Sequence, residues 1–432
     1  MWNKVVLILI VGYLTCGRSF AYIGIPPIKL FLGEIVLGCL VVVRSRETID
    51  RWIESISTPG PLNLLGTTLL FFMADGIFEL LRGLSLGFSP IAALQNLVFN
   101  VYPLYLFAGL WIGTRNPELA RRAIRVLAWT NGIYGVLYIL YLNKLLFAIP
   151  GTYPPIPLFG QPSGSPIALL GLLCFEEDLA RRWVVLALNS FVLLGIQVRA
   201  EFAGIMVGLV VWGLLKQRIG RIAGIAGLVA ALLLLGFVAD FSIPAPATRG
   251  GKVSTKYIVG RLIAPFNEKL AAEFTPIAQG NAGTAKWRTD WWKAIWETTH
   301  NDGTTAAFGR GYGFPLSSLV PYIKNEVLRT PHNAFFYALG YGGWVGVAAM
   351  FGFQLALGGV LWNAYRITGQ PFGIVIWATF LCIALFGNLL ETPFGAIPLY
   401  LLTGLAAAPV QEQQQIRYAY LSRPQLLPTA WR

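Results

Sequence analysis

Apolar segments of about 20 residues recur along almost the whole chain, and this pattern restricts the fold more than any other feature. The first lies at the N-terminus and the last ends near residue 410. Of the 432 residues, 56% are apolar and 12% are charged, about half the charged fraction of an ordinary soluble domain. Segments of this length match the thickness of a bilayer. The sequence therefore predicts an all-α polytopic membrane protein, and it excludes a soluble enzyme or a disordered chain.

Twelve membrane-spanning helices are expected. Their approximate ranges are 1–20, 22–43, 61–81, 90–113, 123–146, 163–175, 183–198, 201–215, 222–239, 332–362, 372–389 and 393–410. The first range also resembles a signal peptide, but no small-residue cleavage site follows cleanly, so it is interpreted as a helix. The predicted organisation has four parts: about nine N-terminal helices in 1–239, a large loop with an amphipathic helix in 240–331, about three helices in 332–410 and a cytoplasmic tail in 411–432.

The basic side chains predict the orientation of these helices. The connections on one side carry most of them, at Arg44, Arg46, Arg51, Arg115, Arg121, Arg122, Arg125, Arg181, Arg182, Lys216, Arg218, Arg221 and Arg366. The short connections on the other side hold little beyond Arg18, Arg82, Lys144 and Arg199. The positive-inside rule places both termini in the cytoplasm and the large loop outside. The net charge of +13 then reflects topology, and no nucleic-acid partner is predicted.

Three basic residues on the predicted outer face are candidates for chemistry. His332 opens the tenth helix behind Pro331, where the helix dipole disfavours protonation and keeps the ring neutral, as a general base requires. Arg199 lies between two apolar helices joined by almost no loop, and an arginine at the membrane edge is a functional candidate. Arg288 lies in a Trp-rich stretch that predicts a helix at the membrane surface. Guanidinium groups bind phosphate oxygens in bidentate fashion, so this set suits an anion site beside a neutral base.

Each candidate also has a plainer structural interpretation. His332 would simply cap its helix. Arg199 would reach toward lipid headgroups or pair with Glu201, and the tryptophans around Arg288 would only anchor a surface helix. These alternatives stay open at the level of the residues.

Metal chemistry is not predicted. The chain has two histidines and four cysteines, no CxxC pair and no DxD pair, so neither a multi-histidine site nor a thiolate site is expected. No cofactor is predicted. A pair of arginines would stabilise a departing diphosphate without a metal, which suits transfer from a lipid diphosphate donor.

Several other polar or glycine-rich positions are interpreted as structural. Asp75, Glu79 and Arg82 are spaced as one face of a helix and predict either an internal polar network or the lining of an acceptor groove, of which the network is favoured. The GRGYGF segment at 309–314 lacks the strand and helix of a phosphate loop and is interpreted as a flexible turn. Gly342 and Gly346 form a GxxxG step that predicts close helix packing.

The segment from Trp287 to Gly346 resembles the O-antigen ligase and O-antigen polymerase superfamily of bacterial membrane glycosyltransferases. It contains the arginine-bearing helix, the GRGYGF turn and PHNAFFYALGYGGWVG, in which a His-Asn pair precedes an aromatic run and a Gly-x-x-Gly step. A second point of similarity is Arg199, although Val198 stands where the family commonly has serine. The twelve-helix layout with one late outer loop is also similar.

The resemblance implies a metal-independent, inverting glycosyltransferase in the bacterial inner membrane, with its active site facing the periplasm. Its donor would be an undecaprenyl-diphosphate-linked glycan and its acceptor lipid A-core or another glycan. Arg199 and Arg288 would hold the donor diphosphate, and His332 would activate the acceptor hydroxyl. Apart from the resemblance, Asn333 and Glu391 are candidate supporting residues, and Glu391, at the outer turn between the last two helices, is otherwise interpreted as structural. The lateness of the single large loop favours a ligase over a polymerase.

Two other classes remain as alternatives. A transporter or flippase would show two related halves, whereas only the second half here contains a large outer loop. A non-catalytic scaffold would tolerate replacement of Arg199, Arg288 and His332. Oligosaccharyltransferase-type enzymes are disfavoured because the first outer loop, at about 18–24, has no acidic residue.

Overall fold

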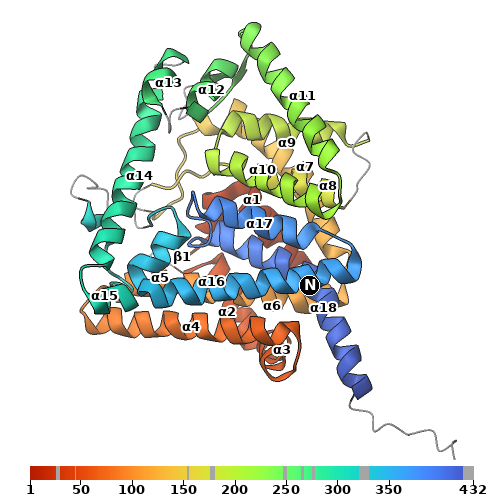
Figure 1. Ribbon diagram of the computed structural model, residues 1–432, viewed down its shortest axis with the longest axis vertical. Coiled ribbons are helices and arrows are strands. Elements are labelled where there is room, and N and C mark those ends of the chain that lie inside the picture. The colour runs from red at the N-terminus through yellow and green to blue at the C-terminus, as the bar shows by residue number, and fades with distance from the viewer. Residues whose placement is uncertain are drawn as a thin grey trace, which may run out of the picture.

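The computed structural model describes residues 1–25, 30–43, 45–152, 155–175, 181–246, 251–263, 267–274, 278–320 and 330–421. Most helices run side by side, and α14 (Ala278–Thr299) lies across one end of them (Figure 1). The short α3 (Ser45–Ser57) and the last turns of α18 (Pro393–Leu421) lie at the opposite end. We refer to these as the α14 end and the α3 end.

Every predicted apolar range contains a helix or a broken pair of helices, but the range 22–43 is helical only from Leu32 onward. Its first part holds two short paired strands, so the helix predicted there is shorter than expected. The helices of these ranges are α1 (Trp2–Ala21), α2 (Leu32–Val43), α4 (Pro61–Ser85), α5 (Pro90–Val101), α6 (Leu104–Arg115), α7 (Leu119–Leu140), α8 (Ser165–Cys174), α9 (Trp183–Ile196), α10 (Arg199–Leu215), α11 (Ile219–Val238), α16 (Ala334–Thr368), α17 (Phe372–Ala384) and α18. Within the described residues, seven spans are long and apolar enough to cross a membrane, with α5 and α6 counted as one. The chain is therefore an all-α membrane protein, and the number twelve stays a prediction.

Strands are few in the described ranges. Two antiparallel pairs are present, β1 (Gly24–Ile25) with β2 (Leu30–Phe31) and β3 (Ser242–Pro244) with β4 (Lys252–Ser254). Both are short connections between helices and contribute little to the core.

The centre of the bundle is the contact between α6 and α18, where small residues let two backbones approach. A Cβ atom added to Gly109 would lie 2.5 Å from the Leu401 carbonyl oxygen, and one on Gly404 would overlap the Leu106 carbonyl oxygen. In a membrane, helices associate through close packing of this kind rather than through the hydrophobic effect. The proline at position 398 lies inside α18 without ending it.

Gly404→Ala is expected to destabilise the fold by about 1–3 kcal/mol, because the added methyl group has no space and must push α6 away from α18. The free energy of unfolding in detergent would measure this loss. Gly359→Ala is the matched control, since a Cβ atom there meets nothing within 4 Å. A Gly404→Ala protein as stable as the Gly359→Ala protein would contradict this account of the contact.

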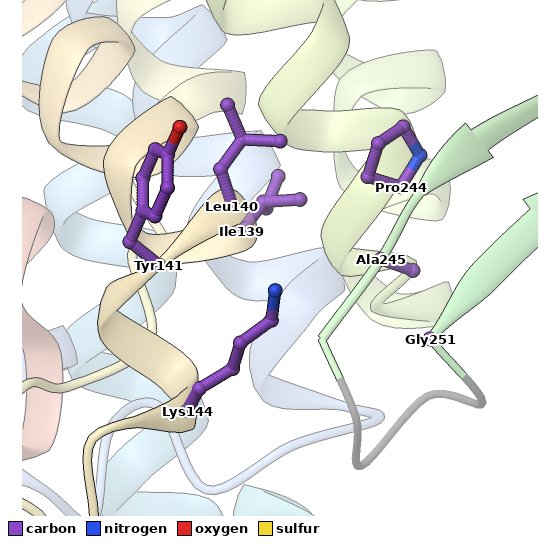
Figure 2. Close-up of a pocket in the computed structure, with 7 residues that line it drawn as sticks. All are labelled: Ile139, Leu140, Tyr141, Lys144, Pro244, Ala245 and Gly251. Carbon is purple, nitrogen blue, oxygen red and sulfur yellow. The ribbon is translucent and has the colours of Figure 1, made fainter.

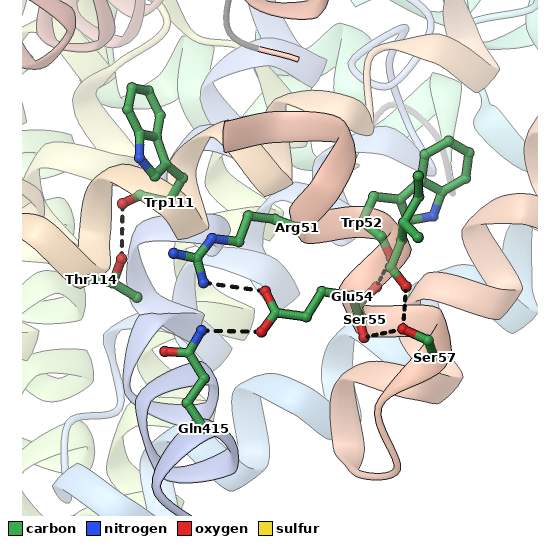
Figure 3. A network of polar contacts seen from close by, with 9 residues as sticks. Arg51, Trp52, Glu54, Ser55, Ser57, Trp111, Thr114 and Gln415 are labelled. Carbon is green, nitrogen blue, oxygen red and sulfur yellow. Dashed lines mark hydrogen bonds and ion pairs between the residues drawn. The ribbon is translucent and has the colours of Figure 1, made fainter. Parts of the chain in front are cut away.

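The α3 end is closed by polar contacts between three helices (Figure 3). The Glu54 carboxylate of α3 accepts hydrogen bonds from Arg51 at 3.4 Å and from Gln415 of α18 at 3.2 Å. Trp52 donates through its indole N–H to the Gly66 carbonyl oxygen of α4 at 3.0 Å. These contacts attach the amphipathic α3 to both α4 and α18.

The large connection between α11 and α16 contains several further helices in its described parts. They are α12 (Thr255–Ile263), α13 (Glu268–Phe274), α14, α15 (Gly303–Phe308) and the 3₁₀ helix η4 (Leu316–Leu319). The Trp-rich helix is confirmed as α14. Its apolar stripe, however, does not only face lipid: Trp291 and Ile295 are fully buried against α16 and η4.

One helix stands apart from the others. No residue of α11 is buried, and its main contacts with the described helices are to its chain neighbours α10 and α12, with one ring contact between Phe237 and Phe274 of α13. Figure 1 shows it leaning away from the bundle. Its 20 residues have the highest mean hydropathy of the candidate spans, as expected of a helix surrounded by lipid.

Candidate functional site

Two backbone carbonyl groups at the end of α17 accept hydrogen bonds from the segments that carry Asn333 and Arg288. Beyond the last turn of α17, the Leu385 carbonyl oxygen accepts a hydrogen bond of 2.7 Å from the Asn333 side chain. The next carbonyl oxygen, on Phe386, accepts one of 3.2 Å from the Arg288 guanidinium. Asn333 opens α16 and Arg288 lies on α14, so α17 ties both helices to one point at the α14 end.

His332 lies between these two anchored residues. Its ring packs edge-to-face on Trp287 of α14, with 5.8 Å between ring centroids. Its backbone has φ +55°, a left-handed conformation that histidine tolerates better than most residues. Burial and then the positive charge of Arg288 lower the pKa of His332 to about 4. The imidazole is therefore neutral at physiological pH, as the sequence predicted, although the dominant cause is burial.

The position of Arg288 is set by the tryptophans around it. Trp291 is buried and donates to the Leu316 carbonyl oxygen at 2.8 Å, and Trp292 donates to the Pro331 carbonyl oxygen at 2.8 Å. Trp292 thus joins α14 directly to the residue before His332. The Arg288 guanidinium lies 5.4 Å from the Trp287 ring centroid, a cation–π distance. These contacts hold an arginine and a neutral histidine against the same indole ring.

Asn333 performs two structural tasks at the start of α16. Its Oδ1 atom accepts from the backbone N–H groups of Phe335 at 2.9 Å and Phe336 at 3.2 Å, which makes it the N-cap. Its amide nitrogen donates to Leu385. It therefore satisfies donors that the helix leaves unpaired and fixes the helix to α17.

Asn333→Ala is expected to destabilise the protein by about 2 kcal/mol, since it removes an N-cap and a buried hydrogen bond worth about 1 kcal/mol each. Asn333→Asp is the matched variant, because its carboxylate keeps the cap but cannot donate to Leu385. Denaturation in detergent should rank the proteins wild type, Asp, Ala. Equal stability of the Asp and Ala variants would show that the cap contributes nothing.

Glu391 lies in the turn between α17 and α18, next to this arrangement. Its side chain is buried, and neither carboxylate oxygen makes a hydrogen bond of acceptable geometry within the described ranges. Burial raises the pKa of Glu391 to about 8, although the nearby Thr330 hydroxyl and Asn333 backbone N–H act in the opposite direction. At neutral pH this carboxyl group is mainly protonated and carries little charge.

Arg199 is the first residue of α10 and reaches the same end of the bundle from another side. It follows Gln197, which ends α9 in a left-handed conformation. α10 packs along α17, and a Cβ atom added to Gly204 would lie 2.6 Å from Ile383. Since α10 begins where α17 ends, Arg199 lies at the level of the α17 carbonyl groups.

A small pocket lies near the turn that carries Arg199 (Figure 2). It has a volume of about 350 Å³ and is lined by residues of α7, the 3₁₀ helix η2 (Leu142–Lys144), β3 and the segments beside β3 and β4: Ile139, Leu140, Tyr141, Lys144, Pro244, Ala245 and Gly251. Figure 2 shows the Lys144 amine extending into this space. Ile139 also packs with Ile196 and Val198 in one apolar cluster, which connects the pocket wall to the Arg199 turn.

The carbonyl groups at the end of α17 are the part of the site that sequence reasoning missed. Leu385 and Phe386 have apolar side chains, and no sequence signal distinguishes their carbonyl oxygens from any others in an apolar helix. The glycine-rich turn at 309–314 was also misjudged. Its backbone N–H groups bond to α4, α5 and α16, so it is anchored and not flexible.

Comparison with known proteins agrees with the family that the motifs indicated. The profile of the family described as O-Antigen ligase matches residues 184–351, a range that contains Arg199, Arg288 and His332. It ends before α17 and Glu391. No curated protein matches the chain. The chain is a multi-pass membrane protein, and the part of it from residue 184 to residue 351 is similar to the O-antigen ligase family.

Proposed function

We propose that this protein is a membrane-embedded glycan ligase. It transfers glycan from an undecaprenyl-diphosphate donor to an acceptor hydroxyl, with lipid A-core as the acceptor class. The observation that carries the proposal is the packing of a neutral His332 and the Arg288 guanidinium against the same indole ring, that of Trp287. A group that accepts a proton and a group that holds an anion are the two elements that such a transfer needs.

The reaction is one displacement at the anomeric carbon of the donor sugar. The acceptor hydroxyl oxygen forms the new glycosidic bond while its proton passes to the free ring nitrogen of His332. The bond from the anomeric carbon to the diphosphate oxygen breaks, and undecaprenyl diphosphate leaves. A single displacement inverts the configuration. Arg288 and Arg199 stabilise the charge on the leaving diphosphate through bidentate contacts, so no metal is required.

Asn333 and Glu391 support this site in different ways. Asn333 anchors the residue after His332 to α17. Glu391, with its raised pKa, brings a mainly neutral carboxyl group beside Thr330 and Asn333, which leaves the positive charge of Arg288 available to the donor.

The orientation follows from the charged residues. The arginine clusters lie beside the N-termini of α7, α9 and α11 and the C-termini of α6, α10 and α16. The positive-inside rule places these ends in the cytoplasm. With twelve spans, the α14 end then faces the periplasm of a bacterial inner membrane, and the 240–331 segment is the large outer loop.

A polymerase of the same superfamily is the second candidate, because it uses the same donor chemistry with a lipid-linked glycan as acceptor. Complementation of a ligase-deficient strain distinguishes the two. A ligase restores laddered lipopolysaccharide, and its His332→Ala variant accumulates lipid-linked polymer. A polymerase leaves the ligase-deficient strain unchanged and instead restores long chains in a polymerase-deficient strain, whose glycan otherwise stops at single repeat units. If the wild-type protein changes neither pattern, and purified protein transfers no glycan, the proposal is wrong.

A further inference from the structure

The helix that begins behind His332 is broken in the middle. Gly343 has φ +61° and ψ −156°, and it separates a first segment, Ala334–Gly342, from the long remainder of α16. Only glycine adopts this conformation without strain. A break of this kind leaves the last carbonyl groups of the first segment without their usual helical donors.

A distant turn supplies those donors. The Arg310 N–H donates to the Gly340 carbonyl oxygen at 2.9 Å, and the Gly311 N–H donates to the Tyr341 carbonyl oxygen at 3.0 Å. The approach is close because glycines stand at the crossing: a Cβ atom on Gly343 would lie 2.5 Å from the Ala307 carbonyl carbon. The break in α16 is therefore stabilised by its contacts with residues 307–311, and it is not a local irregularity of the helix.

Arg82 of α4 lies at the centre of this crossing. Its guanidinium binds Glu79 with contacts of 2.9 and 2.6 Å, and Glu79 is almost completely buried. The same Nη2 atom donates to the Phe308 carbonyl oxygen and lies 3.4 Å from the Tyr341 carbonyl oxygen. One side chain thus joins α4, the end of α15 and the broken end of α16.

The neighbouring contacts fix the same turn to α4 and α5. The Tyr312 N–H donates to the Glu79 carbonyl oxygen at 3.1 Å, and the Gly313 N–H donates to the Asn96 side chain at 3.0 Å. Asn96 in turn donates to the Tyr337 hydroxyl of the first segment at 2.9 Å. The first segment is consequently held along its length and at its broken end.

We propose that Arg82 is a positioning residue for glycan transfer: it sets the direction of the first segment of α16 and so places His332 beside Arg288. The catalytic consequence rests on the proposed function. The segment is about 13 Å long at about 1.5 Å per residue, so a rotation of about 10° at the break would move its start by about 2 Å. Misplacement by about 1 Å lowers a rate about 100-fold.

The histidines of the chain allow a direct test of this position. There are only two, His300 and His332, so a His300→Gln parent leaves a single imidazole to follow by NMR after ¹⁵N-histidine labelling. Its titration reports the surroundings of His332, where Arg288 and Glu391 are the neighbouring titratable groups. In the parent, the ring should titrate near pH 4. Arg82→Ala should move this value toward the ordinary 6.5, because the ring leaves its buried place beside Arg288.

Kinetics provide the second readout in the same parent. Arg82→Ala should lower kcat at least tenfold with little change in the KM for the donor, because Arg199 and Arg288 remain. Arg82→Lys keeps the positive charge and one donor nitrogen. It should recover part of kcat and part of the His332 titration of the parent. Arg115→Ala is the matched control, since this arginine lies at the end of α6, over Trp111, and it should change neither.

The proposal is overturned if folded Arg82→Ala protein keeps the titration and the kcat of the parent, even when it is less stable. If the Arg82→Ala protein does not accumulate, the same two measurements, the His332 titration and kcat, are made on Arg82→Lys and Arg82→Gln and test the proposal in its place. The titration needs no glycan. An unchanged kcat with a shifted titration would therefore reject the catalytic role, and absence of transfer in the parent would reject the proposed function while the titration still tests the position.

Discussion

Replacing His332 with alanine is expected to lower the rate of glycan transfer about 10²- to 10⁴-fold, the range that general base catalysis contributes. The effect should be large because the structure offers a ring that is already neutral and held against Trp287. His332→Gln should be equally impaired, since an amide does not accept the proton of a hydroxyl group. Transfer to a purified acceptor, measured at saturating donor, reports the loss.

The dependence of kcat/KM on pH tests whether His332 acts as a general base. A general base must be unprotonated, so kcat/KM should rise with pH through the His332 pKa of about 4 and stay flat from about pH 5 to about pH 7, where Glu391 is still mainly protonated. A bound diphosphate adds negative charge beside the ring, so the corresponding limb of kcat should lie at higher pH. His300→Gln is the control and should leave both profiles unchanged. Full activity of His332→Ala would remove the base from the mechanism.

Arg288→Ala is expected to lower transfer about 10²- to 10³-fold, the usual effect of removing one donor that stabilises developing negative charge. Arg288→Lys should recover little, because an ammonium group does not make the bidentate contact and is a poor match for the Phe386 carbonyl group that holds the guanidinium. A second consequence concerns His332: without the neighbouring positive charge its pKa should rise, although burial would still keep it below 6.5.

Measurements of donor binding distinguish the role of Arg288 from that of His332. Arg288→Ala should weaken binding of the diphosphate donor, whereas His332→Ala should leave it nearly unchanged. Arg221→Ala is a suitable control because this exposed arginine lies at the start of α11, at the opposite end of the bundle. Normal donor affinity and normal transfer in Arg288→Ala would rule out the diphosphate contact.

The apolar pattern was sufficient to predict the membrane class and the helices, because each helix must satisfy its own backbone in lipid. Arg199 could be selected because a charged group is costly at membrane depth. His332 could be selected because it opens a helix where its ring is kept neutral, and Arg288 because it lies in a Trp-rich helix expected at the membrane surface. The structure places all three at the α14 end. Their chemical roles stay predictions.

Contacts between distant segments could not be predicted in the same way. Arg82 was expected to join a network with Asp75 and Glu79, and the bond to Glu79 is present. Its bond to Phe308 spans 226 positions in the chain, and no local pattern reports it. The tryptophans of α14 show a similar limit, since an indole that packs on protein and one that packs on lipid present the same apolar surface in a sequence.

The isolation of α11 has a mechanical consequence. Its length of about 30 Å, from 20 residues at about 1.5 Å each, equals the hydrocarbon thickness of a typical bilayer. No buried side chain sets its inclination, so the bilayer does: a thinner membrane tilts the helix further and a thicker one straightens it. Because α11 leads directly into β3, a change in the tilt of α11 would also move the start of that strand relative to the bilayer.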